Sequence, residues 1–302
     1  VEKCDTSSAA FQSEETGLVD FTGSEEDILS QIRSLVTILP ANNEDDMSYS
    51  ECTDDLNRVC SDLENYAGAT DLALAQISDD NFFLEVKKDY DKSMVTGFIR
   101  LNGTTVGCVA NRTAVYAADG VKEDEFDAVL SANGAEKAAK FVSFCDAFNI
   151  PLLTLVNVKG YKACKCTERR IAKNAGRLTY AFANASVPKV TVVVGEAYGT
   201  AYLTMNSKSI GADVVYAWSN ATIGMMDASA AAKIMYADEI AKADDSVAAA
   251  YREMQSSALA AAKRGYVDDI IEACDTRKRV IAAFEMLFTK REDRPDRKHG
   301  TV

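Results

Sequence analysis

Apolar and polar positions follow two different periods along the 302-residue chain, and the period changes near Phe82. Before this point, Ser24 with Glu26 and Asp27 forms the start of a capped helix, whose apolar residues recur at helical spacing until Pro40. Two more helices are expected near 53–66 and 71–76, with no clear period at 1–22 and a polar loop at 41–50. The first eighty residues are therefore predicted to be a helical segment.

After Phe82, short β-branched and aromatic runs replace the helical spacing. The runs V-T-G-F-I-R-L and T-T-V-G-C-V-A flank Asn102-Gly103, which is a strong hairpin signal. Strands are then expected at 83–86, 152–158, 189–195, 213–218 and 222–226, and helices at 134–148, 167–185, about 200–208, 238–263 and 276–287. Alternation of buried strands with helices favours an α/β fold built from βαβ-type units.

One stretch, from Pro188 to Ser207, carries candidate chemistry. A buried strand leads into a turn of small residues, with Gly199 and Ala201, and a helix start follows. Free backbone N–H groups at such a helix start point toward one spot, which is the geometry of an oxyanion hole. The same small residues also suit a plain strand-to-helix turn, and Tyr161 and Tyr202 also suit a half-buried core.

The net charge, the apolar content and the cysteines argue against nucleic-acid-binding, membrane-spanning and disulfide-rich classes of protein. The net charge is −13, so a polyanion such as nucleic acid is repelled overall. No apolar run reaches 18 residues, so no membrane-spanning helix is expected. Eight cysteines are scattered through a chain of this size, which does not resemble a disulfide framework and favours a cytoplasmic location.

The cysteines and the histidine offer little for a metal site. Cys164 and Cys166 are the one close pair, and neither His299 nor the distant cysteines supply two further zinc ligands. We expect this pair to bind no metal and to form no structural disulfide, because residues two apart are badly placed for the bridge. His299 lies in a charged tail, where solvation is expected.

Four blocks of sequence, in order, carry a family resemblance: G-A-E-K-A-A-K-F-V-S-F-C-D-A-F-N-I-P-L-L-T-L-V-N-V-K-G-Y, V-P-K-V-T-V-V-V-G-E-A-Y-G-T-A-Y, G-A-D-V-V-Y-A-W and the C-terminal R-G-Y-V-D-D-I-I-E through R-P-D-R-K-H-G. They resemble the C-terminal half of the carboxyltransferase subunit of biotin-dependent acyl-CoA carboxylases. The resemblance covers about 80–300, and 24–80, with L-P-A-N-N, resembles that family's bridging segment. It implies a crotonase-like fold of repeated ββα units at 81–302, preceded by an extension and bridging helices at 1–80.

The resemblance also assigns site residues. The family's G-G-A-Y turn corresponds to Gly199, Thr200, Ala201 and Tyr202, with Leu203 next in the chain. Backbone amides of Thr200 and Ala201 would then stabilise charge on the ureido oxygen of biotin, and the facing P-G-F loop corresponds to Lys159, Gly160 and Tyr161. The chain departs from the family's glycines at Thr200, Asp227, Arg169 and Arg170, where a side chain predicts strain or crowding.

Three functions follow as hypotheses. The first is a carboxyltransferase of an acyl-CoA carboxylase, which moves a carboxyl group from carboxybiotin to acetyl-CoA or propionyl-CoA. The second is the same subunit in a biotin-dependent decarboxylase, of the methylmalonyl-CoA or glutaconyl-CoA type. The third is a non-catalytic assembly half of a split carboxyltransferase.

Each hypothesis implies partners. The expected partners are acyl-CoA, a biotin carboxyl carrier protein and an N-terminal carboxyltransferase half that supplies the acyl-CoA site. A homo-oligomer is also expected, because the Ala-rich run 238–263 has small residues that let another helix approach closely.

Overall fold

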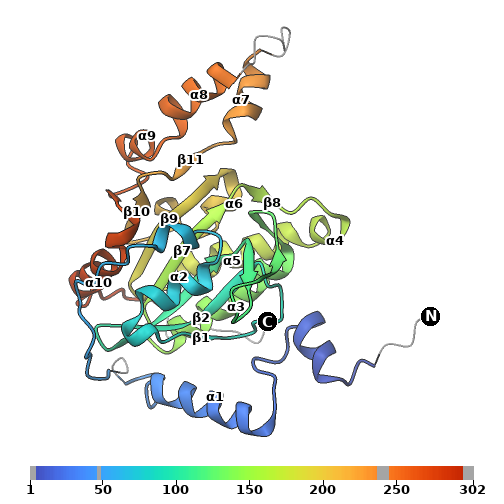
Figure 1. The fold of residues 1–302 in the computed structure, drawn as a ribbon, viewed down its shortest axis with the longest axis vertical. Coiled ribbons are helices and arrows are strands. Elements are labelled where there is room, and N and C mark those ends of the chain that lie inside the picture. The colour runs from blue at the N-terminus through green and yellow to red at the C-terminus, as the bar shows by residue number, and fades with distance from the viewer. Residues whose placement is uncertain (1–4, 46–48, 237–244, 295–302) are drawn as a thin grey trace.

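The computed structural model describes residues 5–45, 49–236 and 245–294. A mostly parallel sheet lies at its centre, with helices on both faces and an arm of short helices that extends from one end (Figure 1). The strands are β1 Leu84–Glu85, β2 Met94–Leu101, β3 Thr104–Asn111, β4 Ala114–Tyr116, β5 Lys122–Glu125, β6 Val129–Leu130, β7 Leu152–Val158, β8 Gly160–Tyr161, β9 Lys189–Tyr198, β10 Val214–Trp218, β11 Thr222–Gly224 and β12 Asp269–Ile271. The helices are α1 Glu25–Ile38, α2 Thr70–Ile77, α3 Ala132–Ala147, α4 Lys165–Glu168, α5 Ile171–Asn184, α6 Gly199–Leu203, α7 Ala228–Met235, α8 Asp245–Tyr251, α9 Ala258–Lys263 and α10 Thr276–Met286.

The main sheet has the strand order β1-β2-β3-β7-β9-β10-β12, and β11 pairs with the end of β9. Strands β1, β2 and β3 pair antiparallel, whereas the pairings from β3 through β12 are parallel. The predicted β2–β3 hairpin is confirmed, because Asn102 and Gly103 form its turn with φ of 50° and 74°. The short β4–β5 hairpin is a pairing that the sequence pattern did not predict.

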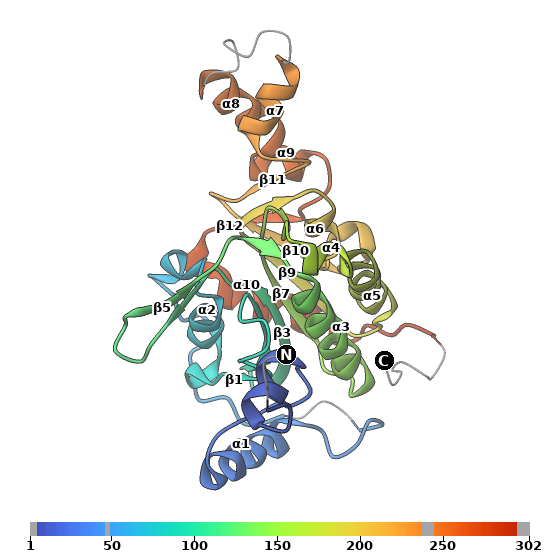
Figure 2. The same ribbon diagram turned by 90° about the vertical axis from the view of Figure 1, so that its right-hand side faces the viewer.

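Both faces of the sheet are buried, and the side chains of one strand pack into two different hydrophobic cores, one on each face. In β9, Val193 and Ala197 join the core under α3 and α5, whereas Val192 and Val194 join the core under α2 and α10. Because side chains alternate between faces along a strand, a continuous apolar run is what a sheet covered on both sides requires. Figure 2 shows α3 and α5 packed side by side against the sheet.

The N-terminal segment differs in part from its prediction. The capped helix is confirmed: the hydroxyl oxygen of Ser24 accepts from Asp27 N, and the Asp27 carboxylate accepts from Ser24 N. The helix predicted at 53–66 is wrong, since only Leu63–Tyr66 forms a single 3-10 turn. Aspartates at 54, 55 and 62 and Ser61 favour turns over a continuous helix in this stretch.

Part of this segment is tightly packed against the sheet. Leu63, Leu74 and Ile77 are completely or almost completely buried in the core beneath α10. Helix α1 is the looser part, because Leu29, Ile32 and Val36 are substantially exposed. Residues that surround α2 therefore belong to the packed body, and α1 lies at its edge (Figure 1).

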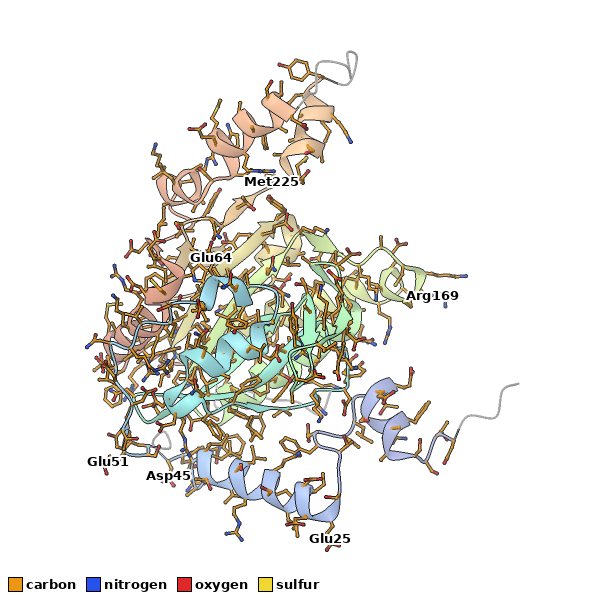
Figure 3. The ribbon with its side chains drawn as sticks, in the orientation of Figure 1. Glu25, Asp45, Glu51, Glu64, Arg169 and Met225 are labelled. Atoms are coloured by element: carbon orange, nitrogen blue, oxygen red, sulfur yellow. The ribbon has the colours of Figure 1, made fainter. Side chains whose placement is uncertain are left out.

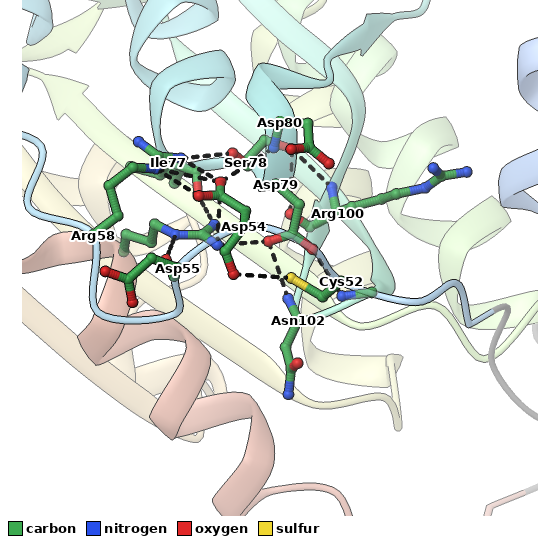
Figure 4. Close-up of polar contacts among 12 residues, drawn as sticks. Cys52, Asp54, Asp55, Arg58, Ile77, Ser78, Asp79, Asp80, Arg100 and Asn102 are labelled. Carbon is green, nitrogen blue, oxygen red and sulfur yellow. Dashed lines mark hydrogen bonds and ion pairs between the residues drawn. The ribbon is translucent and has the colours of Figure 1, made fainter.

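A buried arginine ties this segment to α10. The fully buried Arg277 guanidinium lies 2.8 Å from the Asp79 carboxylate and 3.4 Å from the Asp54 carboxylate. Figure 4 shows these two aspartates close together. It also donates to the backbone carbonyls of Ile77 (2.7 Å) and Asp55 (3.1 Å). Every bond joins residues about 200 apart in the chain, so the cluster fixes α10 against the segment around α2.

The Ala-rich stretch departs from the predicted single helix. Residues 238–244 lie outside the described residues, and the rest divides into α8, a π-helical turn Arg252–Ser256 and α9. Ser257 is extended (φ −66°, ψ 154°), and its hydroxyl caps α9 by accepting from Ala260 N. Ser257 therefore separates the π-helical turn from α9. Helix α9 ends at Lys263, and Gly265, with φ of 79°, takes the left-handed conformation that is common just after a helix.

No helix in the described part of the chain is long and apolar enough to cross a membrane.

Candidate functional site

The site is built where β9 passes into α6. A bulge in β9 opposite Asn157 of β7 shifts the register of the two strands, and the Asn157 side-chain oxygen accepts from Glu196 N at 3.1 Å. A Cβ at Gly195 would lie only 2.6 Å from that oxygen, so glycine is required for this close approach. The bulge and the missing side chain together fix the direction in which β9 leaves the sheet.

Gly199 makes the turn itself. Its φ is +60°, in the left-handed region that only glycine adopts cheaply, and a Cβ there would lie 3.2 Å from the Met225 carbonyl oxygen. Met225 follows β11, whose Gly224 pairs with Tyr198 at the end of β9. The requirement for Gly199 is therefore a property of the turn that begins α6.

The amides of Thr200 and Ala201 are the candidate donors. Tyr198 precedes α6 without a side-chain cap, and neither amide donates to a protein acceptor within the described residues. Ala201 is 1% exposed, whereas the Thr200 side chain is exposed. Unpaired N–H groups at a helix start are suited to a negatively polarised oxygen.

Four of the predicted residues, Gly199, Thr200, Tyr202 and Leu203, line one cavity of about 420 Å³. Ala201 lies behind them in the core. Sequence reasoning missed the rest of the wall, which comes from the turn after α6, from β11 and from the stretch between the end of α8 and Tyr266: Lys208, Ser209, Ile223, Gly224, Met225, Tyr251, Gln255, Arg264 and Tyr266. The β11 residues were within reach of prediction, because the carboxyl ends of parallel strands meet at one edge of a sheet.

The chemistry of the cavity wall excludes one kind of catalysis. None of the described residues that line it is Asp, Glu or His, so this part of the wall offers no side-chain carboxylate or imidazole to act as general base. Burial raises the pKa of Tyr202 to about 12, so its phenol keeps its proton at neutral pH. Both cations are engaged, Lys208 with Asp268 at 2.7 Å and Arg264 with the Gln255 carbonyl at 2.8 Å.

Gly160 and Tyr161 are placed beside this cavity. They form β8, which pairs with β6 and contacts α6. A Cβ at Gly160 would meet nothing within 4 Å, so this backbone faces open space. Tyr161, however, lines a different hollow of about 800 Å³, with Asp91 and Lys162 among its walls. The fold thus brings the two predicted loops together, but only the α6 residues line the smaller cavity.

The replaced glycines do not strain the backbone. Thr200 is absent from the residues with positive φ, and its side chain extends into solvent. Asp227 has φ of −57° and caps α7, because its carboxylate accepts from Ser229 N and Ala230 N. The strain expected at these two positions is therefore wrong, since neither needs the left-handed region. Arg169 lies on α4, which projects from the body (Figure 3).

Metal ligands do not gather here. Across 5–45, 49–236 and 245–294, no group of three or more His, Cys, Asp or Glu side chains is arranged to hold a metal ion. His299 lies outside the described residues. The candidate chemistry of the site therefore rests on backbone donors and on an apolar wall.

The family assignment follows from the whole chain. The model of the carboxyl transferase domain matches residues 5–302, so the chain belongs to this family. The crotonase-like fold that the sequence resemblance predicted is confirmed by the solved structure of transcarboxylase 12S, a hexamer described with hydrolysed methylmalonyl-coenzyme A bound. That structure aligns with a TM-score of 0.85 and 35% identity over 96% of this chain and 57% of its own.

Relatives of three kinds are similar to this chain. The propionyl-CoA carboxylase carboxyltransferase subunit of Haloferax mediterranei is 40% identical over 302 residues, which is 95% of this chain and 57% of the relative. The methylmalonyl-CoA carboxyltransferase 12S subunit of Propionibacterium freudenreichii subsp. shermanii is 38% identical (94% and 55%). The methylmalonyl-CoA decarboxylase subunit alpha of Propionigenium modestum is 37% identical (91% and 54%). The chain spans just over half the length of these relatives.

Proposed function

We propose that this chain forms the biotin-side half of a biotin-dependent carboxyltransferase that exchanges a carboxyl group with propionyl-CoA or methylmalonyl-CoA. The observation that carries the proposal is the pair of unpaired amides at Thr200 and Ala201, at the start of the helix whose residues Gly199, Thr200, Tyr202 and Leu203 line the cavity. The acyl substrate follows from relatives named for propionyl-CoA and methylmalonyl-CoA.

The residues present fit a biotin ring. The cavity is of a size typical of small-molecule sites, and its wall is largely apolar, with Leu203, Ile223 and Met225 beside the polar amides. Bound carboxybiotin would supply the carboxyl group and leave negative charge on its ureido oxygen. The Thr200 and Ala201 amides would stabilise that charge without reorganisation, since α6 holds them in place.

Other residues of this chain have supporting roles in the proposal. Gly199 sets the angle of the amides, and the neutral Tyr202 phenol offers a hydrogen bond without adding charge. Because no carboxylate or imidazole is among the described lining residues of the cavity, proton transfer to or from the acyl-CoA is assigned to groups outside this wall. A second half that binds acyl-CoA would complete the site, as would a carrier protein that delivers biotin.

The proposal covers both directions of transfer. Relatives named as a carboxylase subunit, a carboxyltransferase and a decarboxylase are all 37–40% identical, so the coupled subunits, rather than this chain, would set the direction. Assembly as a homo-oligomer and a cytoplasmic location belong to the same proposal.

The test is carboxyl transfer from methylmalonyl-CoA to free biotin, measured with this chain joined to an N-terminal carboxyltransferase half. Transfer that depends on both biotin and the second half supports the proposal. A complex that assembles and binds acyl-CoA but transfers no carboxyl group to biotin would leave the assembly hypothesis in its place. Malonyl-CoA is the matched control for acyl size, and slower transfer is expected with it.

A further inference from the structure

Two cysteines lie together on the chain that leaves β8. Cys164 and Cys166 are separated by Lys165, and their Sγ atoms are 2.6 Å apart. Cys166 is exposed and Cys164 is partly exposed, so small reagents in solvent reach this pair. Cys108 and Cys145, in contrast, are completely buried in the two cores.

The local backbone explains why the two sulfur atoms meet. Cys164 is extended (φ −148°, ψ 153°) and caps α4, where its Sγ accepts from Thr167 N at 3.4 Å. The preceding loop is held by Lys162 N, which donates to Leu130 O at 3.0 Å. Because Cys166 occupies the first turn of α4, its side chain faces back toward the capping sulfur.

The surroundings favour a thiolate at Cys164. Hydrogen bonds from Cys166 and then from Thr167 lower the pKa of the Cys164 thiol to about 7. Lys162, Lys165 and Arg169 are exposed on the same short stretch, and Glu168 is the acidic residue among them. Burial raises the pKa of Cys108 and Cys145 well above the ordinary value, which makes those two thiols unreactive.

We propose that Cys164 and Cys166 form an oxidisable dithiol, a modification site at which a hydroperoxide converts the two thiols to a reversible disulfide. The Cys164 thiolate attacks one peroxide oxygen, the O–O bond breaks, and Cys164 becomes a sulfenic acid as hydroxide leaves and takes up a proton. The Cys166 thiol then displaces the sulfenic oxygen, the S–S bond forms, and water leaves. Two thiols are oxidised and one peroxide is reduced to two water molecules.

This bond would be labile rather than structural. A bridge between residues two apart closes a very short loop, and short, exposed bridges are strained and easily reduced. The prediction that the pair forms no structural disulfide therefore stands beside the proposal. Oxidation would also withdraw the Sγ atom of Cys164, three residues beyond Tyr161 in the chain, from the Thr167 amide that it accepts from. The chemistry itself does not depend on the proposed function.

The test treats the reduced chain with one equivalent of hydrogen peroxide at pH 7 and digests it with a protease that does not cleave after lysine. The peptide that holds both cysteines should lose about 2 Da, and dithiothreitol should restore it. In Cys166→Ser, the reaction should stop at a sulfenic acid on Cys164 that dimedone traps. In Cys164→Ser, oxidation of Cys166 should slow at least about tenfold, and serine keeps the helix cap so that the fold is preserved.

Cys274→Ser is the matched control, because Cys274 is a partly exposed cysteine whose Sγ contacts Asp275 rather than a second thiol. It should leave the oxidation of the Cys164 peptide unchanged. An unmodified Cys164 peptide while Cys274 is oxidised would overturn the proposal. So would an unchanged rate at Cys166 in Cys164→Ser, because Cys164 would then not be the attacking group.

Discussion

Polar groups are fully paired in the cluster around Arg277, whereas two backbone amides at the start of α6 are unpaired. Arg277 is fully buried, and its guanidinium binds two carboxylates and two backbone carbonyls. The amides of Thr200 and Ala201, in contrast, have no protein acceptor among the described residues. Satisfied polar groups hold a fold together, whereas unsatisfied ones beside a cavity are available to a ligand.

The electrostatics of the Arg277 cluster agree with a structural role. The Arg58 side chain, with help from Asp80 N and Arg277, lowers the pKa of Asp54 to about 2, so this carboxylate is charged at any ordinary pH. Asp79 also accepts from the Gly103 amide at 2.7 Å, which links the cluster to the β2–β3 turn. The charged groups of Arg277, Asp54 and Asp79 all have partners within the protein. We therefore expect mutations here to change the stability of the fold rather than the rate of carboxyl transfer.

The largest expected effect is on stability. Arg277→Met should lower the free energy of unfolding by about 3–5 kcal/mol, because it leaves the buried Asp79 carboxylate without its counter-ion. Urea denaturation measures this loss. Arg279→Met is the matched control on the same helix, since Arg279 is about half exposed and lies 3.5 Å from Asp269, and it should cost at most about 1 kcal/mol. Equal losses in both variants would contradict the structural role of the cluster.

The second prediction concerns a buried lysine whose ammonium is also satisfied. Lys137 donates to the Tyr90 and Met94 carbonyls, and burial lowers its pKa to about 7. Between pH 7 and 10, the unfolded chain binds this proton and the folded chain does not, so stability rises with pH. The unfolding free energy of the wild type relative to Lys137→Met should therefore rise by roughly 1.4 kcal/mol per pH unit in this range.

Lys140→Met supplies the comparison for that slope. Lys140 lies one turn further along α3 with its side chain 53% exposed, so Lys140→Met removes a lysine from the same helix without removing a buried ammonium. The same dependence on pH in both variants would show that the slope does not come from the buried Lys137 ammonium.

A smaller effect is expected at the turn before α6. Gly199→Ala should cost about 1–2 kcal/mol of stability, because alanine pays for a φ of +60° and its Cβ approaches the Met225 carbonyl. Gly176→Ala, inside α5 with nothing within 4 Å of the new Cβ, should instead stabilise by about 0.5–1 kcal/mol. Thermal unfolding of both variants tests this contrast, and stabilisation by both would mean that Gly199 is not strained.

Local signals predicted the turn and the hairpin because the chemistry lies within a few residues. The β2–β3 turn requires positive φ at two adjacent positions, which Asn102 and Gly103 tolerate. The apolar run before Gly199 indicates a buried strand that ends at a turn of small residues. The cavity wall was not predictable in this way. Tyr251 and Arg264 reach it from two separate places in the chain, and only the packing of the arm brings them to α6.

The failed predictions have a common cause. Helical spacing at 53–66 does not form a helix, because aspartate and serine side chains stabilise turns and Arg277 captures the Asp54 carboxylate. The Ala-rich run breaks at Ser257 for a similar reason, since its hydroxyl caps a new helix. In both cases, polar side chains that bond to nearby backbone or to distant partners override the apolar period.

The most direct test of the central claim compares two changes at one residue. Thr200→Pro removes one amide from the start of α6, and Thr200→Ala removes only an exposed side chain. In the biotin-dependent transfer assay, Thr200→Pro should lower the rate by at least about 100-fold, or roughly 2.7 kcal/mol of transition-state stabilisation. Thr200→Ala should keep nearly the full rate, and both variants should assemble alike. Equal rates in the two variants would contradict the assignment of these amides to the biotin oxygen.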